Sequence, residues 1–80
     1  MDIQEIKETL QNKFDSVGVM QDGSYIARRA YPYPNRIAAV RDMRRRLDDV
    51  FPNAHVYNCG DLKDGRTRAT ISWFIEFGFE

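Results

Sequence analysis

Two helical periods, each followed by an Asp-Gly pair, constrain the fold of this chain more than any other feature of its sequence. Over residues 2–14, apolar residues recur at spacings of three and four, which places their side chains on one helix face. They are Ile3, Ile6, Leu10 and Phe14. The chain then alternates toward Asp22-Gly23, a strong hairpin signal because glycine accepts positive φ at little steric cost. We therefore predict a helix followed by a hairpin with strands over residues 17–20 and 24–31.

The second half of the chain predicts the same order. Asn35 is a good helix N-cap, and the helix that it starts is expected to end before Pro52. The predicted apolar face of this helix contains Ile37, Val40, Met43, Leu47 and Val50 or Phe51. A strand over residues 54–59, a polar turn over residues 60–66 and a long strand over residues 67–79 should follow.

The connector between the two halves is Tyr31-Pro32-Tyr33-Pro34, called here the Tyr-Pro loop. Each proline lacks a backbone donor and biases the preceding residue toward extended geometry, so we predict a stiff loop and no central strand. The halves also match in the register of their apolar residues, with Leu10, Phe14, Val17 and Val19 corresponding to Leu47, Phe51, Ala54 and Val56. Internal duplication explains this match, and so do two unrelated helix-hairpin units that each bury one face.

These elements predict an α+β fold with the order αββαββ. Two helix-hairpin units most economically form a two-layer sandwich, a four-stranded antiparallel sheet with both helices on one face, as in a permuted ferredoxin-like fold. Eighty residues provide one core, so we expect residues 1–80 to form a single domain. The expected core contains Leu10, Phe14, Val19, Leu47, Phe51, Val56, Ile71 and Trp73. In the last strand, one face carries Ala69, Ile71, Trp73, Ile75, Phe77 and Phe79.

Composition and motif searches exclude several classes of protein. Apolar residues are 42% and charged residues 30%, which is typical of a globular chain. No apolar run reaches the roughly 18 residues of a membrane span, and the acidic start does not resemble a secretory signal, so we expect a soluble cytoplasmic protein without membrane partners. The lone cysteine, Cys59, excludes a disulfide framework, and Cys59 and His55 alone do not complete a zinc site. Without a glycine-rich phosphate loop either, we expect no metal, no cofactor and no enzymatic activity.

Arginine is concentrated in one part of a chain whose net charge is zero. Residues 28–46 contain seven arginines and one acid, and the planar guanidinium fork favours specific contact with carboxylate or phosphate. Three pairs spaced by four residues are expected to stabilise the helix: Asp42 with Arg46, Arg44 with Asp48, and Arg45 with Asp49. We assign partner binding to Arg28, Arg29, Tyr33, Arg36 and Arg41. In the Tyr-Pro loop, Tyr31 is expected to pack on the core and Tyr33 to contact the partner.

The face of the sheet away from the helices is a second candidate surface. From strand alternation it should carry His55, Tyr57, Arg68 and Phe74. Such a face stacks unpaired bases, seats a partner protein, or is covered by a second copy of the chain in a homodimer. The orientation of the predicted strand over residues 24–31 stays open, because either Tyr25, Ala27 and Arg29 or Ile26, Arg28 and Ala30 could face inward.

Two functions of different classes follow from these surfaces. We favour a small non-enzymatic regulator or inhibitor that binds a partner protein through the arginine patch and the Tyr-Pro loop. Chains of this size are common among accessory factors of phages and other mobile elements. The alternative is a single-stranded RNA- or DNA-binding module that uses the open sheet face and the arginines. The zero net charge and the acidic flanks of the arginine block argue against this alternative.

Overall fold

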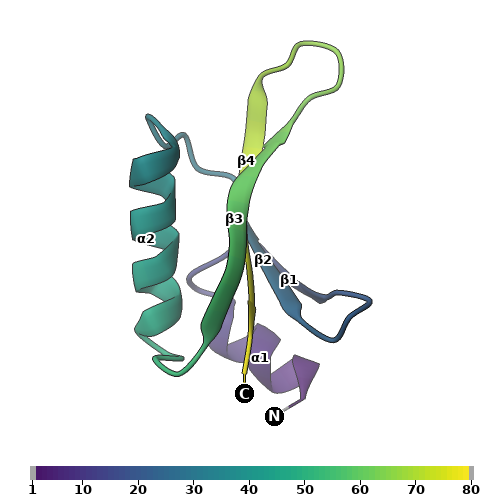
Figure 1. Ribbon diagram of the computed structural model, residues 1–80, viewed down its shortest axis with the longest axis vertical. Helices are drawn as coiled ribbons and strands as arrows, with labels where there is room; N and C mark the ends of the chain where they lie inside the picture. Colours follow the sequence, from purple (N-terminus) through teal and green to yellow (C-terminus); the bar gives the residue numbers. More distant parts are fainter. Residues whose placement is uncertain (1, 80) are drawn as a thin grey trace.

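The computed structural model describes residues 2–79, and the order of elements in them is the predicted αββαββ (Figure 1). The elements are α1 (Ile3–Leu10), β1 (Ser16–Val19), β2 (Tyr25–Arg29), α2 (Arg36–Asp48), β3 (His55–Lys63) and β4 (Thr70–Gly78). The strands pair antiparallel in the order β1-β2-β4-β3. Moving the first strand of a βαββαβ sandwich to the end of the chain produces this order. The predicted fold class is confirmed.

Both helices begin at side chains that cap their first free backbone donors. The Asp2 carboxylate accepts from the Glu5 N–H at 2.9 Å, and the Asn35 side chain accepts from the Ala38 N–H at 2.9 Å. The first helix ends at Leu10, earlier than predicted, but a hydrogen bond from the Phe14 N–H to the Leu10 carbonyl continues the helical turn, and Phe14 is still buried. In residues 2–79, no helix has the length and apolar character needed to cross a lipid bilayer.

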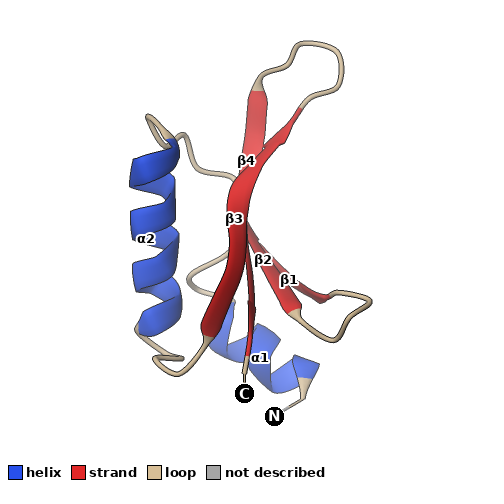
Figure 2. Cartoon of the chain, in the orientation of Figure 1, coloured by secondary structure: helices blue, strands red, loops and turns tan. Residues whose placement is uncertain are grey.

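The core lies between the helices and one face of the sheet. Figure 2 shows α2 and α1 following the left and lower sides of the strands, and the buried residues of both helices belong to one cluster with Ala27, Ile75 and Phe77. Of the predicted core, Leu10, Phe14, Leu47, Phe51 and Trp73 are buried and Val56 is partly buried. Ala27 lies in register with the buried Ile75, so Tyr25, Ala27 and Arg29 face the helices and Arg28 faces away.

The prediction was wrong for two residues of the core and for one residue of the apolar helix face. Val19 is 53% exposed because it ends the edge strand β1. Ile71 is 58% exposed because the β3–β4 hairpin extends beyond the end of α2, as Figure 1 shows. Ile37, assigned to the inner face of the helix, is 71% exposed. Helix coverage therefore decides which apolar residues of this small sheet are buried.

The second hairpin is longer than predicted, because Gly60 belongs to a strand. A Cβ atom at Gly60 would lie 3.2 Å from the Phe74 ring, so glycine makes room for this ring. The turn instead forms around Asp64, whose side chain accepts from the N–H groups of Arg66 and Thr67. The chain returns to the strand at Thr70, and Arg68 adopts a φ of 64° within the turn. The prediction that Arg68 lies on the sheet face was therefore wrong.

Candidate functional site

Three arginines, one from β2 and two from α2 itself, converge on one carboxylate in the middle of α2. Oδ2 of Asp42 accepts from Nε of Arg46 at 2.8 Å and from Nη1 of Arg29 at 3.5 Å. Oδ1 of Asp42 lies 3.3 Å from Nη2 of Arg45, and the Tyr33 hydroxyl donates to Oδ2. We call these five residues the Asp42 cluster.

The Asp42 cluster joins the Tyr-Pro loop to the sheet and to α2. Arg29 is the last residue of β2 and lies in register with Trp73 on the covered face. Its guanidinium donates to the Tyr33 hydroxyl at 2.7 Å and lies 4.1 Å from the centre of the Tyr31 ring. The Tyr33 ring packs edge-on against Trp73, with 6.2 Å between ring centres. The loop is thus held by contacts with both layers.

The electrostatics of the Asp42 cluster favour the ionised carboxylate of Asp42 and the protonated guanidinium of Arg46. Burial by itself raises the pKa of Asp42, but hydrogen bonds from Tyr33 and Arg46 and the attraction of nearby guanidinium groups outweigh it and lower that pKa below 3.8. Burial, followed by the hydrogen bond to Asp42, raises the pKa of Tyr33. The hydrogen bond to Asp42 raises the pKa of Arg46. At neutral pH three positive charges and one negative charge leave the cluster with a net charge of +2.

The predicted ladder of ion pairs along α2 is only partly present. Asp42 and Arg46 pair as predicted. Arg45 turns back to Asp42 instead, and Asp49 pairs with Lys13 from the first half of the chain at 3.2 Å. Within residues 2–79, no ion pair joins Arg44 to Asp48. The prediction for Arg45 was wrong because spacing alone ignores the competing partners Asp42 and Lys13, and the prediction for Arg44 was wrong because its side chain stays exposed without an ion pair in this part of the chain.

The structure separates the residues predicted to bind a partner. Arg29 and Tyr33 belong to the Asp42 cluster, whereas Arg28 projects from the opposite face of the sheet. Arg36 and Arg41 are exposed on α2. The two loop tyrosines also differ from expectation. Tyr33, which was expected to contact the partner, packs against the core, whereas Tyr31, which was expected to pack on the core, is 48% exposed.

An exposed apolar residue among arginines is a feature that the sequence prediction missed. A helix turns about 100° per residue, so Arg41 lies about 40° and Arg44 about 20° from Ile37 around the axis. We call Ile37, Arg41 and Arg44 the outer stripe of α2. Within residues 2–79, neither arginine of the stripe forms an ion pair. The signal was available, because Ile37 lies about 120° around the axis from Met43, the centre of the buried face.

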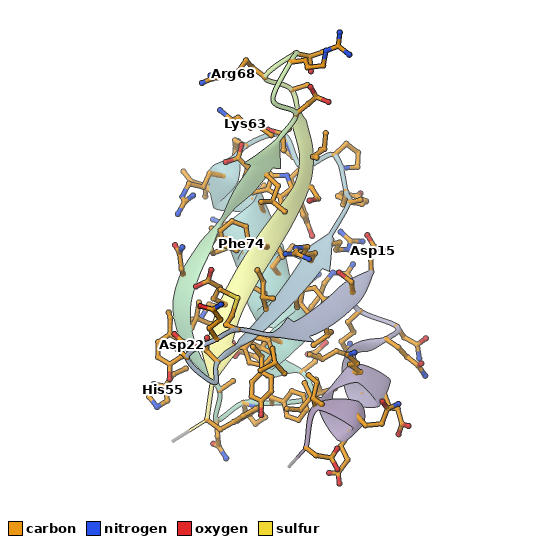
Figure 3. All side chains as sticks on the ribbon, turned by 90° about the vertical axis from the view of Figure 1, so that its right-hand side faces the viewer. Asp15, Asp22, His55, Lys63, Arg68 and Phe74 are labelled. Atoms are coloured by element: carbon orange, nitrogen blue, oxygen red, sulfur yellow. The ribbon has the colours of Figure 1, made fainter. Side chains whose placement is uncertain are left out.

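The open face of the sheet, on the side away from α2, carries Phe74, Tyr57 and His55 of the four residues predicted for it. Figure 3 shows this face and labels Phe74 and His55. Phe74 lies near the middle of the face, in register with Arg28 on one side and Gly60 on the other. Tyr57 is 55% exposed at a β-bulge, and its ring occupies the space beside Gly78. His55 lies at the lower end of β3, whereas Arg68 lies apart at the hairpin tip.

A comparison with models of protein families, with curated proteins and with solved structures found no significant match to this chain. Among residues 2–79, no group of three or more His, Cys, Asp or Glu side chains is placed to hold a metal ion. Three surfaces of the molecule are therefore the candidates for function: the outer stripe of α2, the open sheet face and the Asp42 cluster.

Proposed function

We propose that this chain is a small non-enzymatic regulator or inhibitor that binds a partner protein through the outer stripe of α2. The observation that carries the proposal is Ile37, a large apolar side chain that is 71% exposed and has Arg41 and Arg44 beside it on the helix surface. Interfaces commonly combine an apolar anchor with arginine, because the anchor gains from burial and the guanidinium forms directional hydrogen bonds.

The chemistry of the stripe defines the partner surface that would fit it. Ile37 requires an apolar pocket, and the two arginines require carboxylates at the rim of that pocket. Arg36 lies about 20° from Met43 around the helix, and its Nη1 lies 3.6 Å from the position of a Cβ at Gly60 in β3, so it turns toward the sheet and away from this surface. The exposed Tyr31 belongs to the loop that leads into α2 and extends the candidate surface beyond the helix. Arg29 and Tyr33 then support this surface from within instead of touching the partner.

Charge reversal on the two faces of the molecule tests this proposal. The tagged wild-type chain, Arg41→Glu and Arg28→Glu are compared in pull-downs from nuclease-treated lysate of the source cells, after circular dichroism confirms that each variant folds. We expect the wild type and Arg28→Glu to retain the same protein and Arg41→Glu to lose it, because only Arg41 lies on the stripe. Retention of that protein by Arg41→Glu and its loss by Arg28→Glu would reject the stripe as the interface.

Single-stranded RNA or DNA binding is the second candidate, and the register of the open face favours it. Arg28 and Phe74 are directly opposed on neighbouring strands, so a cation and an aromatic ring share one uncovered face. A base could stack on Phe74 or Tyr57 while Arg28 contacts a phosphate. In this case Arg28→Glu should abolish binding to a mixed-sequence single strand at low salt, and Arg41→Glu should retain it.

A further inference from the structure

We propose that the cavity between the Tyr-Pro loop and α2 binds a phosphate monoester group. The cavity has a volume of about 270 Å³ and is lined by Arg29, Tyr31, Tyr33, Ala38, Asp42 and Arg46. Pockets for drug-sized ligands usually have volumes of about 300 to 1,000 Å³, so this cavity suits a small group or one end of a larger ligand. The proposed site lies apart from the outer stripe of α2 and goes beyond the proposed function, on which it does not depend.

The charge of the Asp42 cluster fits a dianion. Its three guanidinium groups and one carboxylate leave a net charge of +2. Both oxygens of Asp42 already accept hydrogen bonds, so this carboxylate has little capacity left to accept hydrogen bonds from further donors. A phosphate monoester carries a charge of about −1.5 to −2 at neutral pH. A carboxylate or a phosphodiester carries a single negative charge and would leave the cluster positive.

Arg29 is positioned to bind such a group with little loss of freedom. Its side chain is only 18% exposed, and its hydrogen bonds to Tyr33 and Asp42 both use Nη1. Stacking on Tyr31 fixes the plane of the guanidinium, which leaves Nε and Nη2 as a fork for two phosphate oxygens. Arg46, which is 28% exposed, uses Nε for Asp42 and Nη1 for the Lys13 carbonyl, so its Nη2 is the remaining donor.

A larger cavity at the β1–β2 turn offers a weaker case. Its volume is about 620 Å³, but Asp22 is its one charged lining residue. That carboxylate already accepts from the backbone N–H and the hydroxyl of Ser24, and these hydrogen bonds lower the pKa of Asp22. The Asp42 cluster is therefore the site whose charge and free donors specify a ligand class.

Titration of the full chain with inorganic phosphate, followed by NMR, tests the site. At pH 7.5 and constant ionic strength, we expect saturable shifts of the Arg29 and Arg46 side-chain N–H signals and of the Tyr31 ring. Acetate should produce much smaller shifts, because it carries one charge. Equal shifts with chloride or acetate, or shifts spread evenly over exposed arginines such as Arg44, would show screening alone and overturn the proposal.

Two arginine variants locate the site. Arg29→Gln should weaken phosphate binding by about tenfold or more, because a charge-assisted fork is lost, whereas the matched control Arg66→Gln, at an exposed position in the β3–β4 turn, should bind as the wild type does. If Arg29→Gln does not fold, Arg45→Gln replaces it, since this side chain is 77% exposed and its removal takes one charge from the cluster. Unchanged phosphate affinity in the folded cluster variant would overturn the site.

The protonation of phosphate provides an independent test. Between pH 7.5 and 5.5 inorganic phosphate changes from mainly a dianion to almost entirely a monoanion, since its second pKa is about 7, against about 6 for a monoester, whereas sulfate remains a dianion. The titratable groups that line the cavity are Arg29 from β2, both loop tyrosines, and Asp42 and Arg46 from α2; Arg45 lies outside the lining and contacts Asp42. The lowered pKa of Asp42 and the raised pKa values of Tyr33 and Arg46 keep these three groups in one protonation state over this range.

Phosphate binding should therefore weaken at pH 5.5 and sulfate binding should not. Equal affinity for phosphate at both pH values would contradict dianion recognition. O-phosphoserine then separates two sources of the same group: tighter binding than inorganic phosphate supports a phosphorylated side chain as the ligand, and equal binding supports free phosphate. A single strand without a terminal phosphate that binds the cavity equally well would reject monoester specificity.

Discussion

The two sides of α2 contain the same types of residue but place them in opposite environments. On the inner side, Leu47 is fully buried, and Arg46 pairs with Asp42 at 2.8 Å. On the outer side, Ile37 is 71% exposed, and Arg44 has no ion pair within the described part of the chain. The first side stabilises the fold, and the second leaves an apolar anchor and cations available for binding.

This difference shows that arginine content alone does not identify a binding surface. Arg44, Arg45 and Arg46 are consecutive, yet their side chains have different surroundings. Arg44 is exposed to solvent, Arg45 contacts Oδ1 of Asp42, and Arg46 contacts Oδ2 of Asp42. Helix rotation separates neighbouring side chains by about 100°, so the surrounding elements decide which of them find partners. Paired substitutions on the two sides of the helix can therefore test the contrast directly.

The largest expected difference is between the apolar residues of the two sides. Leu47→Ala should destabilise the fold by roughly 2 to 5 kcal/mol, because it removes a fully buried side chain and leaves a cavity. Ile37→Ala should change the free energy of unfolding by less than about 0.5 kcal/mol, because the side chain is exposed. Urea unfolding of both variants measures this. Equal losses would mean that Ile37 is covered in solution, for example by a second copy of the chain.

The next largest effect concerns the two aspartates of the helix. Asp42→Asn should cost about 2 kcal/mol, because it removes the charge that three guanidinium groups and the Tyr33 hydroxyl share. Asp48→Asn, the matched control, should change stability by less than about 0.5 kcal/mol. Urea unfolding at pH 7 gives both values. Similar stabilities of the two variants would show that the Asp42 cluster does not stabilise the fold.

Acid titration sharpens the result for Asp42. Because its folded-state pKa lies below 3.8, the ionised carboxylate contributes stability that is fully present above this ordinary value. That contribution is lost as the pH falls through the lowered pKa of the folded state. The stability difference between the wild type and Asp42→Asn should therefore be constant from pH 7 to about 5 and shrink below about 4. If the stability difference between the wild type and Asp42→Asn does not change in acid, the effect of the variant comes from altered hydrogen bonding or packing and not from the lost charge.

The architecture was predictable from the sequence because it rests on local signals. The period of α1, the Asn35 cap and the two Asp-Gly pairs identify helices and hairpins without reference to the rest of the chain. The exact extent of the second hairpin was not predictable in this way. Gly60 suggested a turn, but its role depends on the Phe74 ring, which reaches it only after the strands have paired.

The site was less predictable because it depends on contacts between distant segments. Sequence spacing identified the Asp42–Arg46 pair, which lies within one helix. It could not show that Arg29 and Tyr33 also reach Asp42, because these contacts require the Tyr-Pro loop to fold back over α2. The misassigned exposure of Ile37 has a similar cause, since the helix leaves only part of its surface against the sheet.

The smallest expected effect separates stability from binding within one run of arginines. Arg46→Gln should cost about 1 kcal/mol, because it removes the 2.8 Å ion pair with Asp42 and the hydrogen bond to the Lys13 carbonyl. Arg44→Gln should leave stability within about 0.5 kcal/mol of the wild type. Partner capture should show the opposite order, with Arg44→Gln weakened and Arg46→Gln retained. Because the two substitutions are chemically identical and only two positions apart, their total charge and composition are the same. Only the side of α2 differs, so two variants with the same stability and the same capture would remove the distinction between its inner and outer sides.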